Sequence, residues 1–271
     1  MNIPLAAGAM AADSLTVKVV DDRGRGVPRV GVTWRGDPSG YATVSPGTST
    51  TDGDGVARAA LLASTRPGPA QVSARITVDG EPSVLTFNVT VSPAPLATFT
   101  INPSPLAMAV GVSRQFSVFA TDAFGNPLSN AGVQWTSSAG DVLEVGAGGT
   151  VTSKALGSAV ITATLGGITR TVNVYVVPST IAVCETGTAE VCGAWTWQGS
   201  HYAGQWQDGA TASISVLRFT AGEAQFARTD DGRNPGLTAV YTGTVAGHTA
   251  RGAVTWSAAD FSRTGSWRAE W

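Results

Sequence analysis

Apolar and polar residues alternate with a period of two along many short stretches of this chain. In SVLTFNVTV, Phe87, Val89 and Val91 share one face, and RTVNVYVV repeats the pattern with Val172 and Val174. Successive side chains of an extended strand point to opposite faces, so these stretches predict half-buried strands. No stretch combines the apolar spacing of a helix over three turns with capping residues, so we expect an all-β protein.

Composition and charge indicate a globular protein of several domains that does not bind nucleic acid. The 271 residues suggest two or three domains, and the hydrophobic share of 43% is enough for real cores. Only 13% of residues are charged, and the net charge is −2. Neither the whole chain nor any segment has the basic surplus that a phosphate backbone attracts, so no nucleic acid is expected as a partner.

The N-terminal segment 1–14 allows two interpretations. Its apolar stretch, PLAAGAMAA at 4–12, is about half the roughly 20 residues that a spanning helix needs, so no membrane insertion is expected. Small residues at Ala9, Ala11 and Ala12 are typical of the end of a secretory signal, but the basic start is missing. The segment is therefore either a signal remnant or a simple N-terminal tail.

The chain contains two copies of one pattern. The matches occur in the same order in both copies and pair Asp21 with Asp122, Gly24 with Gly125, Trp34 with Trp135, and Ala74 with Ala163. Each copy spans about 80 to 90 residues with about seven short strands, which is the pattern of an immunoglobulin-like sandwich. We expect one domain at 15–93 and another at 97–178, joined by the proline-containing hinge SPAPLATF.

Both copies carry motifs of known families. The first contains DDRGRGVPRVGVTW, TSTTDGDGVARAAL and PAQVSARITV, and it resembles a bacterial Ig-like domain of group 1, the invasin/intimin type. The second contains TFTINPSPLAMAVGVSRQFSVFATDAFGNPLSNAGVQWTSS and GTVTSKALGSAVITATLGG, and it is similar to a bacterial Ig-like domain of group 2. The resemblances imply surface or secreted modules that act as spacers and adhesion arms, without catalytic residues to transfer.

The last segment, 181–271, differs from the two copies. It holds six of the eight tryptophans, and its short amphipathic stretches are separated by turn signals such as Asp208-Gly209 and Asp231-Gly232. Consecutive hairpins of similar length predict an antiparallel meander that closes into a small barrel or rolls into a sandwich.

The aromatic residues of this segment are its candidate ligand-binding residues. They could all fill the core of a small domain, or one or two could remain exposed as a stacking platform for a surface glycan or a protein. The candidates are Trp195, Trp197, Tyr202, Trp206, Trp256, Trp267 and Trp271.

Cys184 and Cys192 are the only cysteines, and they lie eight positions apart. Neither belongs to a C-x-x-C redox motif or adjoins a histidine, so we expect a structural disulfide and an oxidising compartment. By loop-closure entropy, a ring of this size stabilises by about 2 to 3 kcal/mol.

No arrangement of residues predicts catalysis, a metal site or a cofactor. The two histidines lack metal-ligand spacing, no G-x-S-x-G elbow occurs, and Asp52-Gly-Asp54-Gly55 lacks the ligands of an EF-hand. The adjacent acids Asp230 and Asp231 point to opposite faces of a strand, so we expect turn roles for them rather than an acid–base pair.

The sequence therefore favours a non-enzymatic, extracellular or cell-surface adhesion protein. Two Ig-like spacers would present a Trp-rich β domain that binds a carbohydrate or a protein. Two alternatives remain open: a purely structural module of an extracellular filament, a matrix or a phage virion, and an accessory fragment of a secreted hydrolase.

Overall fold

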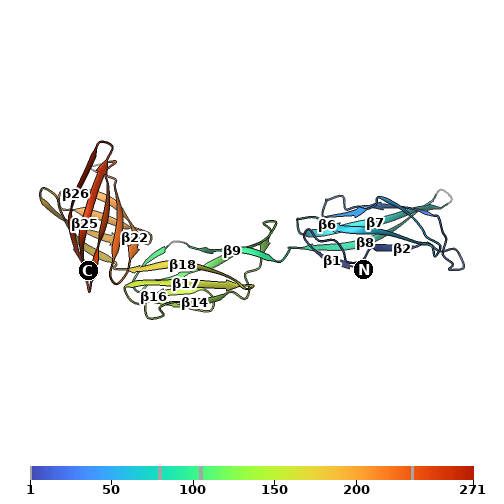
Figure 1. The fold of residues 1–271 in the computed structure, drawn as a ribbon, viewed down its shortest axis with the longest axis horizontal. Coiled ribbons are helices and arrows are strands. Elements are labelled where there is room, and N and C mark those ends of the chain that lie inside the picture. The colour runs from blue at the N-terminus through green and yellow to red at the C-terminus, as the bar shows by residue number, and fades with distance from the viewer. Residues whose placement is uncertain (1, 79–80, 104–105, 233–234) are drawn as a thin grey trace. The chain divides into compact units, whose positions relative to one another are not determined.

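The computed structural model describes residues 2–78, 81–103, 106–232 and 235–271, and these form β-strands joined by turns (Figure 1). They include no helix, and hence none long and apolar enough to cross a membrane. The all-β prediction is confirmed. The chain divides into two compact units, Met1–Phe99 with Phe119–Ser129, and Thr100–Val118 with Asn130–Trp271.

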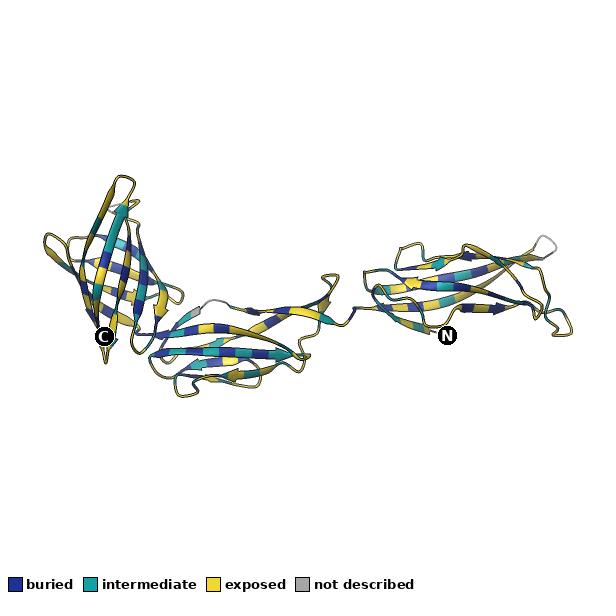
Figure 2. Ribbon diagram, in the orientation of Figure 1, coloured by how far each residue is buried: buried dark blue, intermediate teal, exposed yellow. Residues whose placement is uncertain are grey.

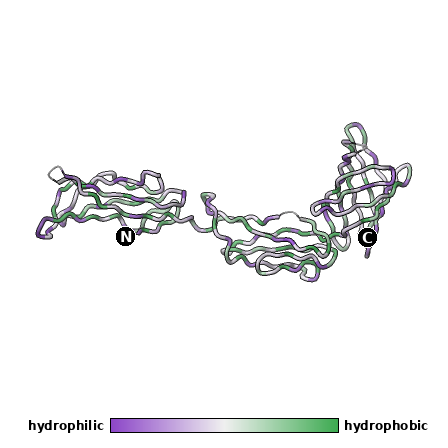
Figure 3. The backbone as a smooth tube through the Cα atoms, turned by 180° about the vertical axis from the view of Figure 1, so that it is seen from behind, coloured by the Kyte–Doolittle hydropathy of each residue, from purple (hydrophilic) through white to green (hydrophobic). Residues whose placement is uncertain are grey.

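The first domain is a sandwich of two sheets, with strand orders β1-β8-β7-β3-β5 and β2-β6-β4. The strands are β1 (Asn2–Ala6), β2 (Leu15–Lys18), β3 (Gly31–Arg35), β4 (Ala42–Ser45), β5 (Thr48–Thr50), β6 (Val56–Ala63), β7 (Gly68–Val78) and β8 (Glu81–Ser92). Along β6, Ala57, Ala59 and Leu61 are buried while Arg58 and Leu62 are exposed. Figure 2 shows this alternation of burial along the strands, and Figure 3 shows the matching alternation of hydropathy.

The N-terminal strand differs from the sequence prediction of a tail or signal remnant over 1–14. Residues 2–6 pair in parallel with β8, from Asn2 opposite Asn88 to Ala6 opposite Ser92. Ile3 and Leu5 contact the buried core of the first sandwich. The alternating apolar residues at 3 and 5 match the period of a strand, which explains why this segment completes the sheet edge.

The repeated aspartate–glycine pairs form the same turn in both copies. Asp21 Oδ1 accepts the backbone N–H groups two and four positions later at 3.0 and 2.8 Å, and Asp122 Oδ1 does the same at 2.9 Å for both. Gly24 and Gly125 have φ values of 77° and 81°, a region that residues with a Cβ rarely adopt. The shared turn confirms this part of the sequence repeat.

The second domain contains sheets of order β10-β18-β17-β14, β11-β16-β15 and β13-β12-β9. Its strands are β9 (Leu96–Asn102), β10 (Leu106–Ala109), β11 (Ser113–Gln115), β12 (Ser117–Asp122), β13 (Pro127–Leu128), β14 (Gln134–Ser137), β15 (Leu143–Val145), β16 (Thr150–Ser153), β17 (Gly157–Leu165) and β18 (Ile168–Val177). On β18, Val172, Val174 and Val176 are buried on one face, as the alternation predicts.

The repeated tryptophans occupy equivalent strand positions but differ in burial. Trp34 lies opposite Ala74 and Trp135 lies opposite Ala163, the two pairs that the sequence repeat aligns. Trp34 is 3% exposed, whereas Trp135 is half-buried. The sheet order explains the difference, because β3 lies between β7 and β5 while β14 is an edge strand.

The last domain is a closed barrel of eight antiparallel strands, in which β26 pairs back with β19. The strands are β19 (Thr180–Thr186), β20 (Glu190–Trp197), β21 (Tyr202–Trp206), β22 (Thr211–Phe219), β23 (Ala224–Asp230), β24 (Thr238–Ala246), β25 (Thr249–Ala258) and β26 (Phe261–Glu270). Of the two folds that the sequence left open for this segment, the barrel is the one that forms.

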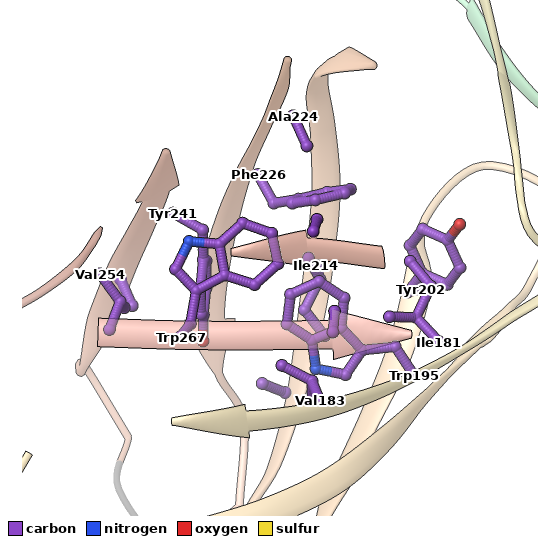
Figure 4. Packing of buried hydrophobic residues seen from close by; sticks show 14 of the residues in the cluster. Ile181, Val183, Trp195, Tyr202, Ile214, Ala224, Phe226, Tyr241, Val254 and Trp267 are labelled. Atoms are coloured by element: carbon purple, nitrogen blue, oxygen red, sulfur yellow. The ribbon is translucent and has the colours of Figure 1, made fainter. Parts of the chain in front are cut away.

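Large aromatic rings fill the barrel interior, and glycines make room for them. Figure 4 shows Trp195, Tyr241 and Trp267 meeting inside the barrel. Tyr241 contacts the other two edge-on, with ring centroids 5.2 and 5.7 Å apart. A Cβ added to Gly243 would lie 2.9 Å from the ring of Trp267, so the missing side chain is what allows this packing.

A candidate ligand site at one end of the barrel

Four of the seven candidate aromatic residues belong to the barrel core. Trp195 and Tyr202 are fully buried, and Trp206 and Trp267 are 4% and 3% exposed. They pack against one another and against neighbouring rings, such as Trp195 on Phe226 at 5.3 Å between centroids. Because their faces are covered by protein, these four do not offer a stacking surface to a ligand.

The other three candidates are partly exposed, but the structure does not bring them into one platform. Trp197 packs edge-on against Tyr202, and Trp271 packs against Phe219. These contacts lie near the entry end of the barrel, which we define as the end where β19 begins. Trp256 lies near the opposite end, where β19 ends and β20 begins, which we call the distal end.

A buried network of charged residues fills the interior at the distal end. Glu185, Arg228 and Asp230 are 6%, 5% and 4% exposed. Arg228 donates to both oxygens of Asp230 at 2.5 and 2.9 Å, and its Nη1 donates to both oxygens of Glu185 at 3.0 and 3.1 Å. The Tyr241 hydroxyl donates to Glu185 Oε1 at 2.7 Å, so the buried charges are all hydrogen-bonded.

The network keeps Arg228 charged and Tyr241 neutral. Burial works against the charged guanidinium of Arg228, but the hydrogen bonds to Asp230 and the charge of Glu185 outweigh it and raise its pKa. Burial raises the pKa of Tyr241 well above its ordinary value, and the charge of Glu185 adds to this. Arg228 therefore remains a cation and Tyr241 a neutral donor. The Arg228 guanidinium also lies over the Trp206 ring, 3.6 Å from its centroid, in a cation–π contact.

A pocket of about 260 Å³ opens at the distal end, next to this network. We call it the distal pocket, and its walls come from the β19–β20 turn, the residues after β21, and the β25–β26 hairpin. It is lined by Glu185, Gly187, Thr188, Ala189, Val191, Trp206, Asp208, Ala210, Arg228, Leu237, Trp256, Phe261 and Arg263. Aromatic and charged groups thus meet in one small concavity, which is the usual composition of a ligand site.

Trp256 is held in this pocket by the buried network. Its indole Nε1 donates to Glu185 Oε2 at 3.1 Å. Its six-membered ring occupies the space beside Gly265, where a Cβ would lie 2.6 Å from the ring. Phe261, which is 47% exposed, lines the same pocket.

A larger concavity of about 840 Å³ follows the outer surface of the barrel. Its lining includes the Cys184–Cys192 disulfide and the outward-facing Arg251, Arg268 and Glu270. Small residues and charged strand residues dominate this surface, and its only aromatic lining residue is the buried Trp206. Its features favour a ligand site less than those of the distal pocket do.

The predicted disulfide is present and joins directly opposite residues. Cys184 and Cys192 face each other across β19 and β20, with Cα atoms 4.0 Å apart and an S–S bond of 2.01 Å. The bond therefore closes a regular hairpin. Glu190 approaches the two sulfur atoms, but bonded sulfurs are not thiolate ligands, so this cluster is not a metal site.

Several residues of the site were not among the sequence candidates. Asp230 and Asp231 do point to opposite faces, yet Asp230 is a buried partner of Arg228 rather than a turn residue. The available signal was a charged residue at each of two inward positions of EAQFARTD, where Phe226 already marks the core face. Alternation likewise puts Glu185 on the face of Ile181 and Val183, and Arg263 on the face of Trp267, but their meeting at one end depends on how the barrel closes.

Two family models match the part of the chain that precedes the barrel. The model described as bacterial Ig-like domain (group 1) matches residues 3–91, and the model described as bacterial Ig-like domain (group 2) matches residues 95–176. No curated protein matches the sequence.

Solved structures that are similar to this chain include those of three bacterial surface proteins. Domains 4 and 5 of the S-layer protein SbsC share 22% identity, with 59% of this chain and 79% of that chain covered and a TM-score of 0.32. The Escherichia coli adhesin FdeC shares 15%, with 95% and 88% covered and a TM-score of 0.43. Invasin, described as a bacterial integrin-binding protein, shares 18%, with 96% and 57% covered and a TM-score of 0.30. Similarity at this level does not extend to function.

Proposed function

Residues 3–91 belong to the group 1 family of bacterial Ig-like domains and residues 95–176 to the group 2 family, and from this premise we propose that the chain is a modular adhesion protein. In this proposal the two Ig-like domains act as spacers, and the C-terminal barrel binds a carbohydrate through its distal pocket. The protein acts by presentation and contact rather than by catalysis.

The distal pocket is the observation that carries this proposal. It combines an aromatic ring held in place by a buried hydrogen bond, Trp256, with an exposed ring, Phe261, and charged groups. Aromatic faces pack against the apolar faces of sugars, and charged side chains bind their hydroxyl groups. The pocket also lies at the barrel end opposite the one where the chain enters from the second Ig-like domain, which leaves it away from that connection.

Two further observations support an extracellular, non-enzymatic role. The Cys184–Cys192 disulfide suits an oxidising compartment. The three buried charged groups of the barrel pair with one another: Arg228 engages both Glu185 and Asp230, which leaves neither carboxylate available as a general base.

The test is a glycan array with the full chain and three variants. We expect the wild-type protein to bind a set of glycans, and Trp256→Ala and Phe261→Ala to lose that binding. Phe119→Ala is the matched control for Phe261→Ala, because Phe119 is also exposed, at 57%, and is not in the barrel. Unchanged binding by both pocket variants would reject the distal pocket as the binding site, and no glycan bound at all would favour the structural role instead.

A further inference from the structure

We infer that the distal pocket selects a sugar that carries a carboxylate, and that Arg263 is the residue that binds the acid group. This inference rests on the proposed function and adds the class of ligand to it. Four features of the described residues carry it: the placement of Arg263, its free donors, the pairing of the surrounding charges, and the size and rings of the pocket.

Arg263 and Trp256 are placed to act on the same ligand. They lie directly opposite each other on β26 and β25, and both fall on the inward-facing positions of their strands. Both line the distal pocket and both are half-buried. A guanidinium and an aromatic ring therefore adjoin each other across one pair of strands, within reach of a single small molecule.

Most of the hydrogen-bonding capacity of Arg263 is unused. A guanidinium has five N–H donors in a rigid planar fork. Among the residues that the structure describes, Arg263 makes one hydrogen bond, from Nη1 to Thr188 Oγ1, and it is long at 3.5 Å. Within the described part of the chain, no carboxylate oxygen lies within 4.0 Å of Arg263.

The acidic groups around the pocket are engaged elsewhere. Glu185 and Asp230 bind the buried Arg228, and Glu185 also accepts from Trp256. Asp208 accepts the backbone N–H of Ala210 at 3.0 Å. Arg263 is thus the pocket cation that lacks a carboxylate counter-ion, and the fork of a guanidinium matches a carboxylate in a bidentate contact.

The size and the rings of the pocket favour a sugar acid over a larger anion. Its volume of about 260 Å³ lies just under the roughly 300 to 1,000 Å³ typical of drug-sized ligands, so a single sugar unit fits its scale. The N–H of Trp256 is already bound to Glu185, so this residue offers its ring rather than a donor. A pyranose acid can place its carboxylate on Arg263 and its apolar face on the neighbouring ring.

The test is calorimetric titration of the full chain with four methyl glycosides. Methyl β-D-glucuronoside and methyl α-N-acetylneuraminoside are the acidic probes, and they separate a uronic acid from a sialic acid as the source of the carboxylate. Methyl β-D-glucoside and methyl β-D-galactoside are the neutral probes. We expect one acidic probe to bind, with both neutral probes roughly 10- to 100-fold weaker, the range set by losing a charge-assisted hydrogen bond.

Three variants then assign the effect to Arg263. Arg263→Gln should remove the preference for the acid, Arg263→Lys should keep only part of it, and Arg251→Gln should leave it unchanged. Arg251 is an exposed arginine on the outer face of the same hairpin, and circular dichroism of each variant verifies the fold.

Two outcomes would overturn the inference. Equal affinity for acidic and neutral probes, with both lost in Trp256→Ala, would reject the carboxylate and leave carbohydrate binding in place. No binding of any probe, together with an empty glycan array, would reject the proposed function as well.

Discussion

Trp256 donates its indole N–H to Glu185, and that carboxylate is the same group that binds Arg228 and Tyr241 in the barrel interior. The orientation of a half-exposed ring therefore depends on a buried ion pair. Any change that disturbs Glu185 should affect both the stability of the barrel and the shape of the distal pocket, because one carboxylate serves both.

Replacing Glu185 with alanine should destabilise the barrel strongly. Arg228 keeps its pair with Asp230 in this variant, but Arg228 Nη1, the Tyr241 hydroxyl and Trp256 Nε1 lose their shared acceptor, and each buried donor left unsatisfied costs about 1 to 3 kcal/mol. Glu190→Ala is the matched control, because Glu190 lies on the same β19–β20 hairpin and forms an exposed ion pair with Arg268 of β26. Such pairs contribute only about 0 to 1 kcal/mol. Urea unfolding of the two variants measures the difference, and equal losses would show that the buried network is not structural.

The disulfide should contribute a modest part of the barrel stability. The double variant Cys184→Ser with Cys192→Ser opens a ring of eight-residue separation, for which loop-closure entropy gives about 2 to 3 kcal/mol. Since β19 and β20 also pair along their whole length, we expect the barrel to remain folded without the bond. Thiol titration of the wild-type protein confirms that the bond is formed, and calorimetry follows the unfolding transition of both proteins. Complete unfolding of the variant would contradict this expectation.

The two repeated tryptophans should differ in their contribution to stability. Trp34 is buried in the first sandwich, and its Nε1 donates to Ser49 Oγ at 2.8 Å, so Trp34→Ala should cost about 3 to 5 kcal/mol. Trp135 lies on an edge strand and is half-buried, so Trp135→Ala should cost clearly less. Differential scanning calorimetry of the full chain resolves this, and equal effects would mean that burial does not set the cost.

The sequence predicts the two sandwich domains because the signals for them are local. The alternation along β18 and the turn at Asp21 and Asp122 each depend on residues close together in the chain. The distal pocket depends instead on closure of the barrel, which brings Glu185 to Trp256 across 71 positions and Arg263 to Thr188 across 75. Alternation could place these side chains on inward faces, but not at one end of the barrel.

The same distinction between local signals and barrel closure explains why the sequence did not predict which tryptophans are buried. Composition left open whether a small domain could bury all of these aromatic residues, and it could not show that inward glycines create space for them. Gly243 makes room for Trp267 and Gly265 makes room for Trp256, so the capacity of the interior depends on residue pairs that adjoin only in the closed barrel. Four of the seven candidates consequently lie in the core.

Acid should weaken the structure around Asp122. Burial opposes ionisation of this carboxyl, but hydrogen bonds from Asn126, Ala94 and Phe124 outweigh it and lower its pKa from 3.8 to about 2. Because the pKa of Asp122 is lower in the folded than in the unfolded protein, its ionised carboxylate stabilises the fold fully at pH values above the unfolded-state pKa. This stabilisation is lost as the pH falls from about 4 toward 2. Asp122→Asn should therefore be less stable than the wild-type protein at pH 6, and the gap should narrow at pH 2.5. Asp260→Asn, at an exposed turn, is the control, and thermal unfolding at both pH values is the measurement. A gap that stays constant with pH would show that the Asp122 side chain stabilises by its shape and not by its charge.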